Sequence, residues 1–301
     1  MSNRLSPSRA LGSSGIKVPL IGYGTSPLGK EKSCSHEQAV RCLHHAIDCG
    51  ITYLDTSPDY GSEKHVGAVM KTRRDEVFLA TKVNRRSREG VLDEIKQSLK
   101  KLQTDHVDLI QVHAINAWAD WEQTIAPDGA LAGLEQARDE GLVKFIGITG
   151  HTRPDILGHA LDEYAFDTVL VALGIIDRLV SSPETFLLPH AKRRGAGVVA
   201  MKVFGHGVVE NRQSALNYSL SLPGVSHAII GLDNEHQIDE IVKLATNYHP
   251  IEDSERDSLI DEVRPIVDKD ASDGSDGKLF WLRDTAVMGW KQHDEPILVS
   301  Y

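Results

Sequence analysis

The chain has 301 residues, a length that suits one large domain or two ordinary ones, and α/β barrels of this length commonly form one unit. Apolar residues make up 41% and charged residues 25%, as in folded globular proteins. The 33 basic and 43 acidic side chains give a net charge of −10, which argues against nucleic acid or an anionic membrane as the main partner.

The N-terminal segment shows no targeting signal. MSNRLSPSRA lacks the apolar core of a signal peptide, and no stretch approaches 18 apolar residues, so we expect a cytoplasmic protein without a membrane partner. Residues 11–18, LGSSGIKV, predict a tight hairpin that could cap the bottom of a barrel.

Three cysteines lie close together in the sequence, at Cys34, Cys42 and Cys49, without a C-x-x-C pair. Cys42 and Cys49 are seven residues apart and therefore share one helical face. This spacing favours buried free thiols over a disulfide or a metal site.

Eight short β-branched runs alternate with segments of helical periodicity. The runs are residues 18–24, 51–55, 77–82, 107–113, 145–149, 168–173, 197–202 and 227–231. Their nearly continuous apolar character is typical of parallel strands covered on both faces. The helical segments include SHEQAVRCLHHAIDCG, which opens with Ser35 and Gln38 as a capping box, and SPETFLLPHAKRRG.

This alternation predicts an α/β fold of the (β/α)8 TIM-barrel type. A doubly wound sheet would also alternate, but it requires a G-x-G-x-x-G turn after the first strand, and GYGTSPLG lacks that spacing. We expect a single domain over residues 1–301, with the barrel core at about 17–248 and a C-terminal extension at about 249–301.

The extension changes in character along its length. Residues 254–270 predict a helix, and residues 270–277, DASDGSDG, predict an acidic loop. A calcium loop starting at Asp268 is excluded, because its sixth position would be Asp273 and its twelfth Leu279. Trp281 and Trp290 either cover the barrel mouth or anchor the tail.

Four polar residues stand at or just after strand ends. Asp55, Lys82 and His113 end three consecutive strands, and Tyr60 follows in the loop after Asp55. Taken singly, a lysine at a strand exit is usually solvated and a histidine more often belongs to the core. In a barrel, however, all carboxyl ends of the strands converge on one mouth, so the four side chains are expected to meet.

Their chemistry fits proton transfer to a carbonyl oxygen. An isolated phenol has a pKa near ~10. A cation beside it favours the phenolate, so we expect Lys82 to draw the pKa of Tyr60 downward, with Asp55 holding Lys82 charged and oriented. His113 can then donate to, or position, the substrate oxygen.

LDTSPDYG, LATK and DLIQVH resemble the aldo-keto reductase family, in which an Asp is followed by a Tyr five residues on, then a Lys, then a His. The resemblance covers about residues 10–245 and includes IGYGT, FIGITGH and LPGVSHAIIGLDNEHQIDE in order. It implies a (β/α)8 barrel, NAD(P)H-dependent reduction of aldehydes and ketones, and the catalytic residues Asp55, Tyr60, Lys82 and His113.

The resemblance also implies the residues that contact the cofactor. These are Gly24, Thr25, Asp55, Thr149, Gly150, His151, Met201, Lys202, Phe204, Gly205, Gly231, Leu232, Asp233, Gln237 and Glu240. Thr149 and His151 stand where the family commonly has a Ser-Asn pair for the carboxamide. Met201 stands where the family often has an aromatic that stacks on nicotinamide, and Lys202 either meets the pyrophosphate or is solvated.

The choice between NADP and NAD rests on residues 231–240, GLDNEHQIDE. Family members usually meet the 2′-phosphate of NADPH with Lys or Arg after the last strand, but this segment has neither. Asp233 and Glu235 would oppose a phosphate, whereas an acid near the ribose can accept from a free 2′-hydroxyl. We therefore expect a weakened preference for NADPH, with NADH used comparably or better.

The expected partner is a small carbonyl substrate, contacted by Tyr60, His113 and Trp118. Trp121 either lines the same loop pocket or packs the loop. The short basic runs KTRRDE and VNRRSRE carry neighbouring acids and indicate solvated charge.

Two other functions fit parts of this pattern. A non-catalytic cofactor-sensing subunit could use the same fold, although all four catalytic residues are present. A metal-dependent barrel lyase or hydrolase is suggested by the 14 histidines, but no H-x-H occurs and His113 has no evident second ligand, so no metal site is expected.

Overall fold

The structure, a computed structural model, describes residues 7–29 and 34–273. A two-stranded hairpin comes first, formed by β1 (Ser8–Ala10) and β2 (Lys17–Pro19). The strands that follow are β3 (Ile21–Gly24), β4 (Tyr53–Asp55), β5 (Phe78–Val83), β6 (Val107–Val112), β7 (Val143–Gly150), β8 (Thr168–Ala172), β9 (Gly197–Met201) and β10 (Val225–Gly231).

The helices alternate with these strands. They are α1 (His36–Asp48), α2 (Glu63–Arg73), α3 (Arg88–Leu102), α4 (Trp118–Ile125), α5 (Ala130–Asp139), α6 (Pro154–Glu163), α7 (Ile175–Val180), α8 (Pro183–Phe186), α9 (Leu188–Arg194), α10 (Arg212–Ser221), α11 (Glu235–Thr246) and α12 (Asp253–Asp273). Short 3-10 turns are η1 (Ser26–Gly29), η2 (Pro58–Tyr60), η3 (Arg74–Glu76) and η4 (Gly205–Gly207).

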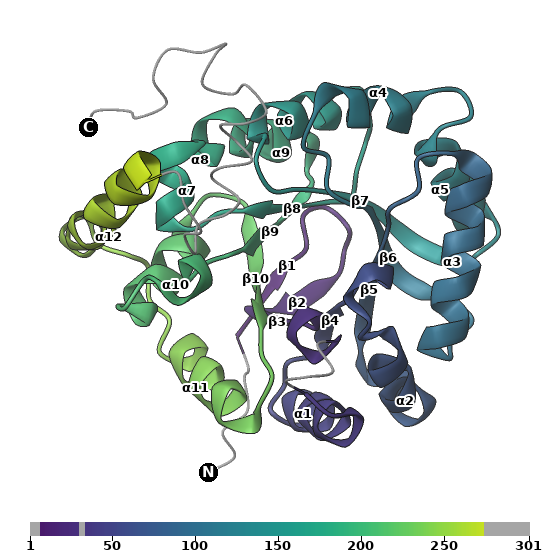
Figure 1. Ribbon diagram of the computed structural model, residues 1–301, viewed down its shortest axis with the longest axis horizontal. Coiled ribbons are helices and arrows are strands. Elements are labelled where there is room, and N and C mark those ends of the chain that lie inside the picture. Colours follow the sequence, from purple (N-terminus) through teal and green to yellow (C-terminus); the bar gives the residue numbers. More distant parts are fainter. Residues whose placement is uncertain (1–6, 30–33, 274–301) are drawn as a thin grey trace.

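Strands β3 to β10 form a closed barrel in the order β10-β3-β4-β5-β6-β7-β8-β9, and every neighbouring pair is parallel. The helices surround this barrel as an outer ring (Figure 1). The predicted (β/α)8 barrel is therefore confirmed.

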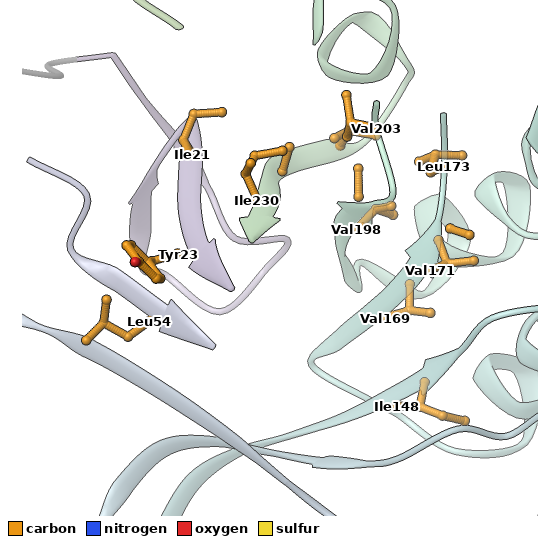
Figure 2. Close-up of a cluster of buried hydrophobic side chains, with 14 of the residues drawn as sticks. Ile21, Tyr23, Leu54, Ile148, Val169, Val171, Leu173, Val198, Val203 and Ile230 are labelled. Atoms are coloured by element: carbon orange, nitrogen blue, oxygen red, sulfur yellow. The ribbon is translucent and has the colours of Figure 1, made fainter. Parts of the chain in front are cut away.

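Alternation along the strands sorts side chains between two cores. Outward-facing residues such as Leu54, Val169 and Ile230 pack against the helices (Figure 2). Inward-facing residues such as Tyr53 and Leu109 form a separate cluster inside the barrel. Because successive side chains point to opposite faces, the inward set along each strand leads up to the polar residues at the mouth.

The N-terminal hairpin closes the barrel from below, as expected. Leu11 and Val18 are buried and pack with Tyr53 inside the barrel. The predicted first strand, residues 18–24, is wrong in one respect, because Val18 and Pro19 pair with β1 in the hairpin. Proline has no N–H for a ladder, and the barrel strand begins only at Ile21.

Several helical predictions need correction. The segment 182–195 forms two helices, α8 and α9, that meet at Leu187, because Pro189 cannot donate to the preceding turn. The segments of α2, α4, α7 and α10 were not predicted as helices. Helix α10 gives a weak amphipathic signal because residues 214–220 are all buried, so it has no polar face along that stretch.

The predicted C-terminal helix packs on the outer ring. Leu259, Val263 and Val267 recur every four residues on one face of α12 and are buried in the main core. The helix extends to Asp273, so the first part of the predicted acidic loop at 270–277 is helical instead. The rest of that loop, with Trp281 and Trp290, lies outside the described residues.

No helix among residues 7–29 and 34–273 combines the length and the apolar character needed to cross a bilayer.

Candidate active site

Inward-facing side chains of β4, β5 and β6 meet at the barrel mouth. Lys82 Nζ donates to Asp55 Oδ1 at 2.5 Å and to the Thr56 carbonyl at 2.8 Å. Gln111 Nε2 donates to the other Asp55 oxygen at 2.9 Å. Asp55, Lys82 and Gln111 are each at most 3% exposed. The strand ends therefore place a buried ion pair, held by an amide, under the mouth.

Tyr60 is placed over this pair by the turn η2. Pro58 starts the turn, and Gly61 ends it in the left-handed region at φ 76°. The Lys82 ammonium lies 4.9 Å from the centre of the Tyr60 ring, and the His113 ring lies 6.0 Å from it in an edge-on arrangement. All four predicted catalytic residues are thus brought together.

Burial and charge act in opposite directions on Tyr60 and Lys82. Burial raises the pKa of Tyr60, and the Lys82 ammonium lowers it by less, so the net direction is upward. Lys82 draws the pKa of Tyr60 downward as expected, but desolvation outweighs the cation, so the net shift is upward. Burial alone would lower the pKa of Lys82, but Asp55 and Tyr60 raise it above its ordinary value.

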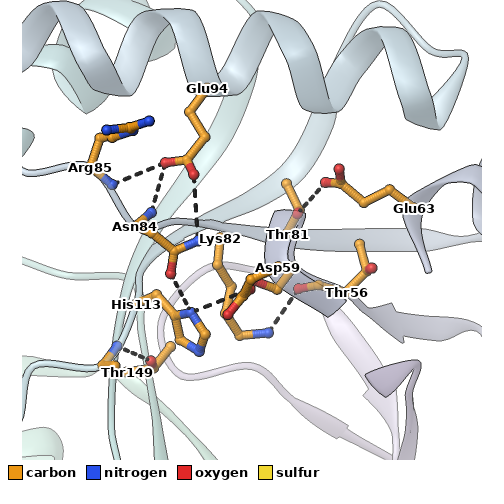
Figure 3. A network of polar contacts seen from close by, with 12 residues as sticks. Thr56, Asp59, Glu63, Thr81, Lys82, Asn84, Arg85, Glu94, His113 and Thr149 are labelled. Atoms are coloured by element: carbon orange, nitrogen blue, oxygen red, sulfur yellow. Dashed lines mark hydrogen bonds and ion pairs between the residues drawn. The ribbon is translucent and has the colours of Figure 1, made fainter. Parts of the chain in front are cut away.

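His113 is a neutral base in this setting. Burial and then the Lys82 charge lower its pKa to about 4, against an opposing contribution from Asp59. Its Nδ1 atom lies 2.7 Å from Asn84 Oδ1 and 3.8 Å from Asp59 Oδ1 (Figure 3). Its backbone carbonyl accepts from Arg86 Nη2 at 2.5 Å.

Sequence reasoning missed several members of this network. Arg86 was assigned to solvated charge, yet it is half-buried and anchors the His113 backbone. Gln111 and Asn84 were not singled out. Gln111 stands two residues before His113 and so points inward like it, and Asn84 comes two residues after Lys82, just beyond the end of β5. That parity was the available signal.

The end of β7 carries three predicted cofactor contacts. Thr149 Oγ1 accepts from the Ala114 N–H at 2.9 Å, which leaves its hydroxyl hydrogen for a ligand. Gly150 is required by packing, since a Cβ there would lie 2.7 Å from the Ile115 carbonyl oxygen. His151 is half-buried, and its buried Nδ1 makes no hydrogen bond within the described residues. A buried ring nitrogen beside the mouth fits a polar ligand group such as a carboxamide.

The segment after β9 is strained. Lys202 and His206 have φ values of 59° and 54°, in the left-handed region, which costs a residue other than glycine about 1–3 kcal/mol. Met201 faces the barrel interior, and Phe204 is partly buried. A Cβ added to Gly205 would lie only 2.4 Å from the Ile176 side chain. The charge of Lys202 is among the causes that lower the pKa of His151, after burial.

The segment after β10, residues 231–240, has arginine neighbours that its own sequence does not show. Gln237 Oε1 accepts from the Asp233 N–H at 3.0 Å and so stabilises the start of α11. Glu240 pairs with Arg212 Nη1 at 2.8 Å, and Glu235 lies 4.0 Å from Arg41. The segment 231–240 itself lacks basic residues, but the fold supplies two from α10 and α1.

Gly231 and Leu232 continue this edge. The Leu232 carbonyl accepts from the Tyr23 hydroxyl at 2.7 Å, and a Cβ on Gly231 would lie 3.0 Å from Pro27. A Cβ on Gly24, at the end of β3, would lie 2.9 Å from the Ile229 side chain.

Thr25 and Trp118 complete the predicted set. Thr25 is buried and donates from both N and Oγ1 to the Asp55 carbonyl, at 2.9 and 3.0 Å, so it holds the strand end that carries Asp55. Trp118 is 43% exposed and packs edge-on against His159. Trp121 is buried and donates to Glu163, so it packs the loop.

One group of possible metal ligands occurs among the described residues, formed by His45, Cys49 and Asp239. It lies between α1 and α11 on the outer ring, apart from the strand ends, and His45 and Asp239 already form an ion pair at 2.8 Å. Cys34, Cys42 and Cys49 are all free.

Comparisons with known proteins agree with this arrangement. Residues 20–215 match the model of the Aldo/keto reductase family. The chain is similar to an L-galactose dehydrogenase of Arabidopsis thaliana, with 30% identity over 79% of this chain and 88% of that protein. It is also similar to a D-threo-aldose 1-dehydrogenase of a Pseudomonas species, with 31% identity over 66% of this chain and 70% of that protein.

A solved structure shares the fold. The holo form of an aldo-keto reductase from Bacillus halodurans superposes with a TM-score of 0.73 at 24% identity, covering 85% of this chain and 95% of that one.

Proposed function

The chain belongs to the aldo/keto reductase family and is an NAD(P)H-dependent oxidoreductase, and on that premise we propose that it interconverts a carbonyl group and an alcohol at Tyr60. The observation that carries the proposal is the buried Lys82–Asp55 pair beneath the Tyr60 ring. The nicotinamide cofactor supplies the hydride for reduction and accepts it in oxidation.

Tyr60 is proposed as the general acid. Because its pKa is raised, its hydroxyl keeps its proton at neutral pH and can donate to the substrate oxygen. The phenolate left behind faces Lys82, whose raised pKa keeps it cationic. Asp55 and Gln111 fix the position of that cation, and solvent returns the proton to Tyr60.

The cofactor would be held along the rim from β7 to β10. His151 Nδ1 and the Thr149 hydroxyl are available for the carboxamide end, and the segment 231–240 with Arg212 is available for the adenosine end. These residues suit a dinucleotide that carries an amide at one end and an adenosine at the other.

The proposal covers both directions of reaction. Both relatives are named as dehydrogenases, and proton transfer at Tyr60 is reversible, so reduction of aldehydes or ketones and oxidation of the matching hydroxyl group use the same residues.

Tyr60→Phe tests the proposal. Loss of general acid catalysis is expected to lower kcat by roughly 10²–10⁴-fold or more, while NADH and NADPH still bind, as followed by fluorescence quenching. Tyr164→Phe, a half-buried tyrosine of the outer ring, is the matched control and should leave kcat unchanged. A Tyr60→Phe enzyme that keeps most of its kcat would refute the assignment.

A further inference from the structure

Three side chains on the outer ring converge on one point beside the seam where the barrel closes. Strand β10 pairs with β3 to complete the barrel, and α11 and α1, which follow these two strands, lie side by side (Figure 1). We propose that His45, Cys49 and Asp239 form a zinc site that joins α1 to α11 and so fastens the first β/α unit of the barrel to the last. This site is separate from the barrel mouth and does not depend on the proposed function.

The geometry of α1 sets two of the ligands. His45 and Cys49 are four residues apart, and the Cys49 N–H donates to the His45 carbonyl at 2.9 Å, so the helical turn continues up to Cys49. Residues four apart on a helix are neighbours on one face. The same spacing places two histidines on one metal in the H-E-x-x-H zinc motif. Cys49 Sγ accordingly lies 3.7 Å from His45 Nε2.

The third ligand comes from α11. Asp239 Oδ1 lies 2.8 Å from the same nitrogen, His45 Nε2, and the ligand atoms of the three residues all lie within 4.8 Å of one another. One ring nitrogen therefore faces a carboxylate and a thiol at once. A proton on Nε2 points in one direction only, whereas a metal ion at this point can bind nitrogen, sulfur and oxygen together.

The distances suit a tetrahedral zinc ion. Bonds of about 2.0 Å to nitrogen and about 2.3 Å to sulfur place those two atoms roughly 3.5 Å apart, close to the 3.7 Å between His45 Nε2 and Cys49 Sγ. A nitrogen and a carboxylate oxygen on the same ion lie about 3.3 Å apart. Asp239 therefore has to withdraw by roughly 0.5 Å, which its side chain, 57% exposed, is free to do.

The charges around the thiol favour a cation. Burial, and then the charges of Asp239 and Asp48, raise the pKa of the Cys49 thiol. The same negative charges attract a divalent metal ion, and coordination then displaces the thiol proton. Asp48 is already paired with Arg73 at 2.7 Å, whereas no lysine or arginine pairs with Asp239 in the described part of the chain. Asp239 is therefore the carboxylate available to the metal.

The donor set selects zinc over the hard cations. One imidazole nitrogen, one thiolate and one carboxylate oxygen are the three donor types that zinc binds in proteins. Magnesium and calcium instead prefer oxygen ligands alone. Three protein ligands leave a fourth position for water, which can reach the site because the side chains of His45 and Asp239 are both partly exposed.

A zinc ion at this place stabilises the closed barrel. His45 and Asp239 are 194 residues apart in the chain, and a cross-link that closes a long loop removes more entropy from the unfolded chain than one that closes a short loop. The proposal departs from the sequence-based expectation that no metal site is present. The spacing of the cysteines could not show this site, because its third ligand lies on a distant helix.

Cobalt(II) binding tests the site, because Co²⁺ occupies tetrahedral zinc sites and its bond to a thiolate gives a charge-transfer band in the near ultraviolet. Titration of the reduced, untagged full chain should develop this band up to one Co²⁺ per chain. One equivalent of Zn²⁺ should abolish the band, and Mg²⁺ should not. Cys49→Ser should remove the band, and His45→Gln and Asp239→Asn should each weaken binding at least about tenfold.

Two control variants on the same helix, Cys42→Ser and His44→Gln, should keep the band, since neither residue belongs to the group of ligands. A cobalt complex without the thiolate band, or a band that persists in Cys49→Ser, would overturn the zinc site.

Urea unfolding tests whether the ion joins the two helices. Zn²⁺ at about 100 times its dissociation constant should shift the unfolding equilibrium about 100-fold toward the folded state, roughly 2.7 kcal/mol. His44→Gln should keep this gain, and Cys49→Ser should lose it. A wild-type protein that gains no stability from Zn²⁺ would overturn the proposal that the ion fastens α1 to α11, and it would leave the proposed reductase function untouched.

Discussion

Lys82→Met should destabilise the protein strongly, because it leaves the Asp55 carboxylate buried without its cation. Asp55 is 3% exposed and would keep only the Gln111 amide among its side-chain partners. Methionine has a similar length and fits an apolar setting, so packing changes little. Removing one partner of a buried ion pair costs about 3–5 kcal/mol.

The double variant Asp55→Asn/Lys82→Met separates charge from packing. Asparagine can still accept from Gln111 and carries no charge, so most of the lost stability should return. Urea unfolding at pH 7, followed by far-UV circular dichroism, gives the free energy of unfolding of wild type, both single variants and the double variant. The double variant should nevertheless remain a poor reductase, because the cation that stabilises the Tyr60 phenolate is missing.

A double variant that is less stable than Lys82→Met would refute the reasoning. It would mean that the unpaired Asp55 carboxylate is not what destabilises Lys82→Met. Full activity in Lys82→Met would refute the proposed role of Lys82 in tuning Tyr60.

Three further predictions concern pH and cofactor choice. Because the pKa of Tyr60 lies above its ordinary value of ~10, kcat for reduction should stay constant between about pH 6 and 9 and fall only at higher pH. A fall in kcat between pH 7 and 8 would contradict the role of Tyr60 as the general acid. Burial lowers the pKa of His227 from 6.5 to about 3 in the folded protein. As the pH drops below 6.5, the His227 imidazole is therefore protonated in the unfolded chain but not in the folded one. The free energy of unfolding should be unaffected by His227 above pH 6.5 and should fall by up to about 5 kcal/mol as the pH approaches 3. In urea unfolding, His227→Met should reduce the dependence of the free energy of unfolding on pH in the acid range, whereas His236→Gln, at an exposed position, should leave it unchanged. An unchanged pH dependence in His227→Met would contradict this prediction. In fluorescence titrations, the affinity for NADPH should exceed that for NADH by less than about 100-fold, a limit of roughly 2.7 kcal/mol. Arg212→Gln should weaken NADPH binding more than NADH binding. Equal losses of affinity for both cofactors would exclude a contact between Arg212 and the 2′-phosphate.

The barrel and the four polar residues at its mouth could be predicted from the sequence because both depend on local periodicity. Short apolar runs alternating with helical segments specify the order of strands, and a polar residue at a strand exit points to the mouth. Asp55, Lys82 and His113 satisfied that rule on neighbouring strands, and the structure brings them together with Tyr60.

Only the tertiary structure decided how burial, charge and hydrogen bonding combine among residues that are far apart in the chain. The net pKa shift of Tyr60 depends on how much protein buries it, which no local pattern states. The His113 ring contacts Asn84 at 2.7 Å, and the backbone N–H of Asn84 donates to Glu94, which lies on the outer helix α3, 19 residues before His113 in the sequence. Arg212 reaches Glu240 from α10, so a segment without basic residues still has one beside it. Periodicity fixes where a side chain points, but charge, burial and hydrogen bonding are sums over neighbours that only the folded chain assembles.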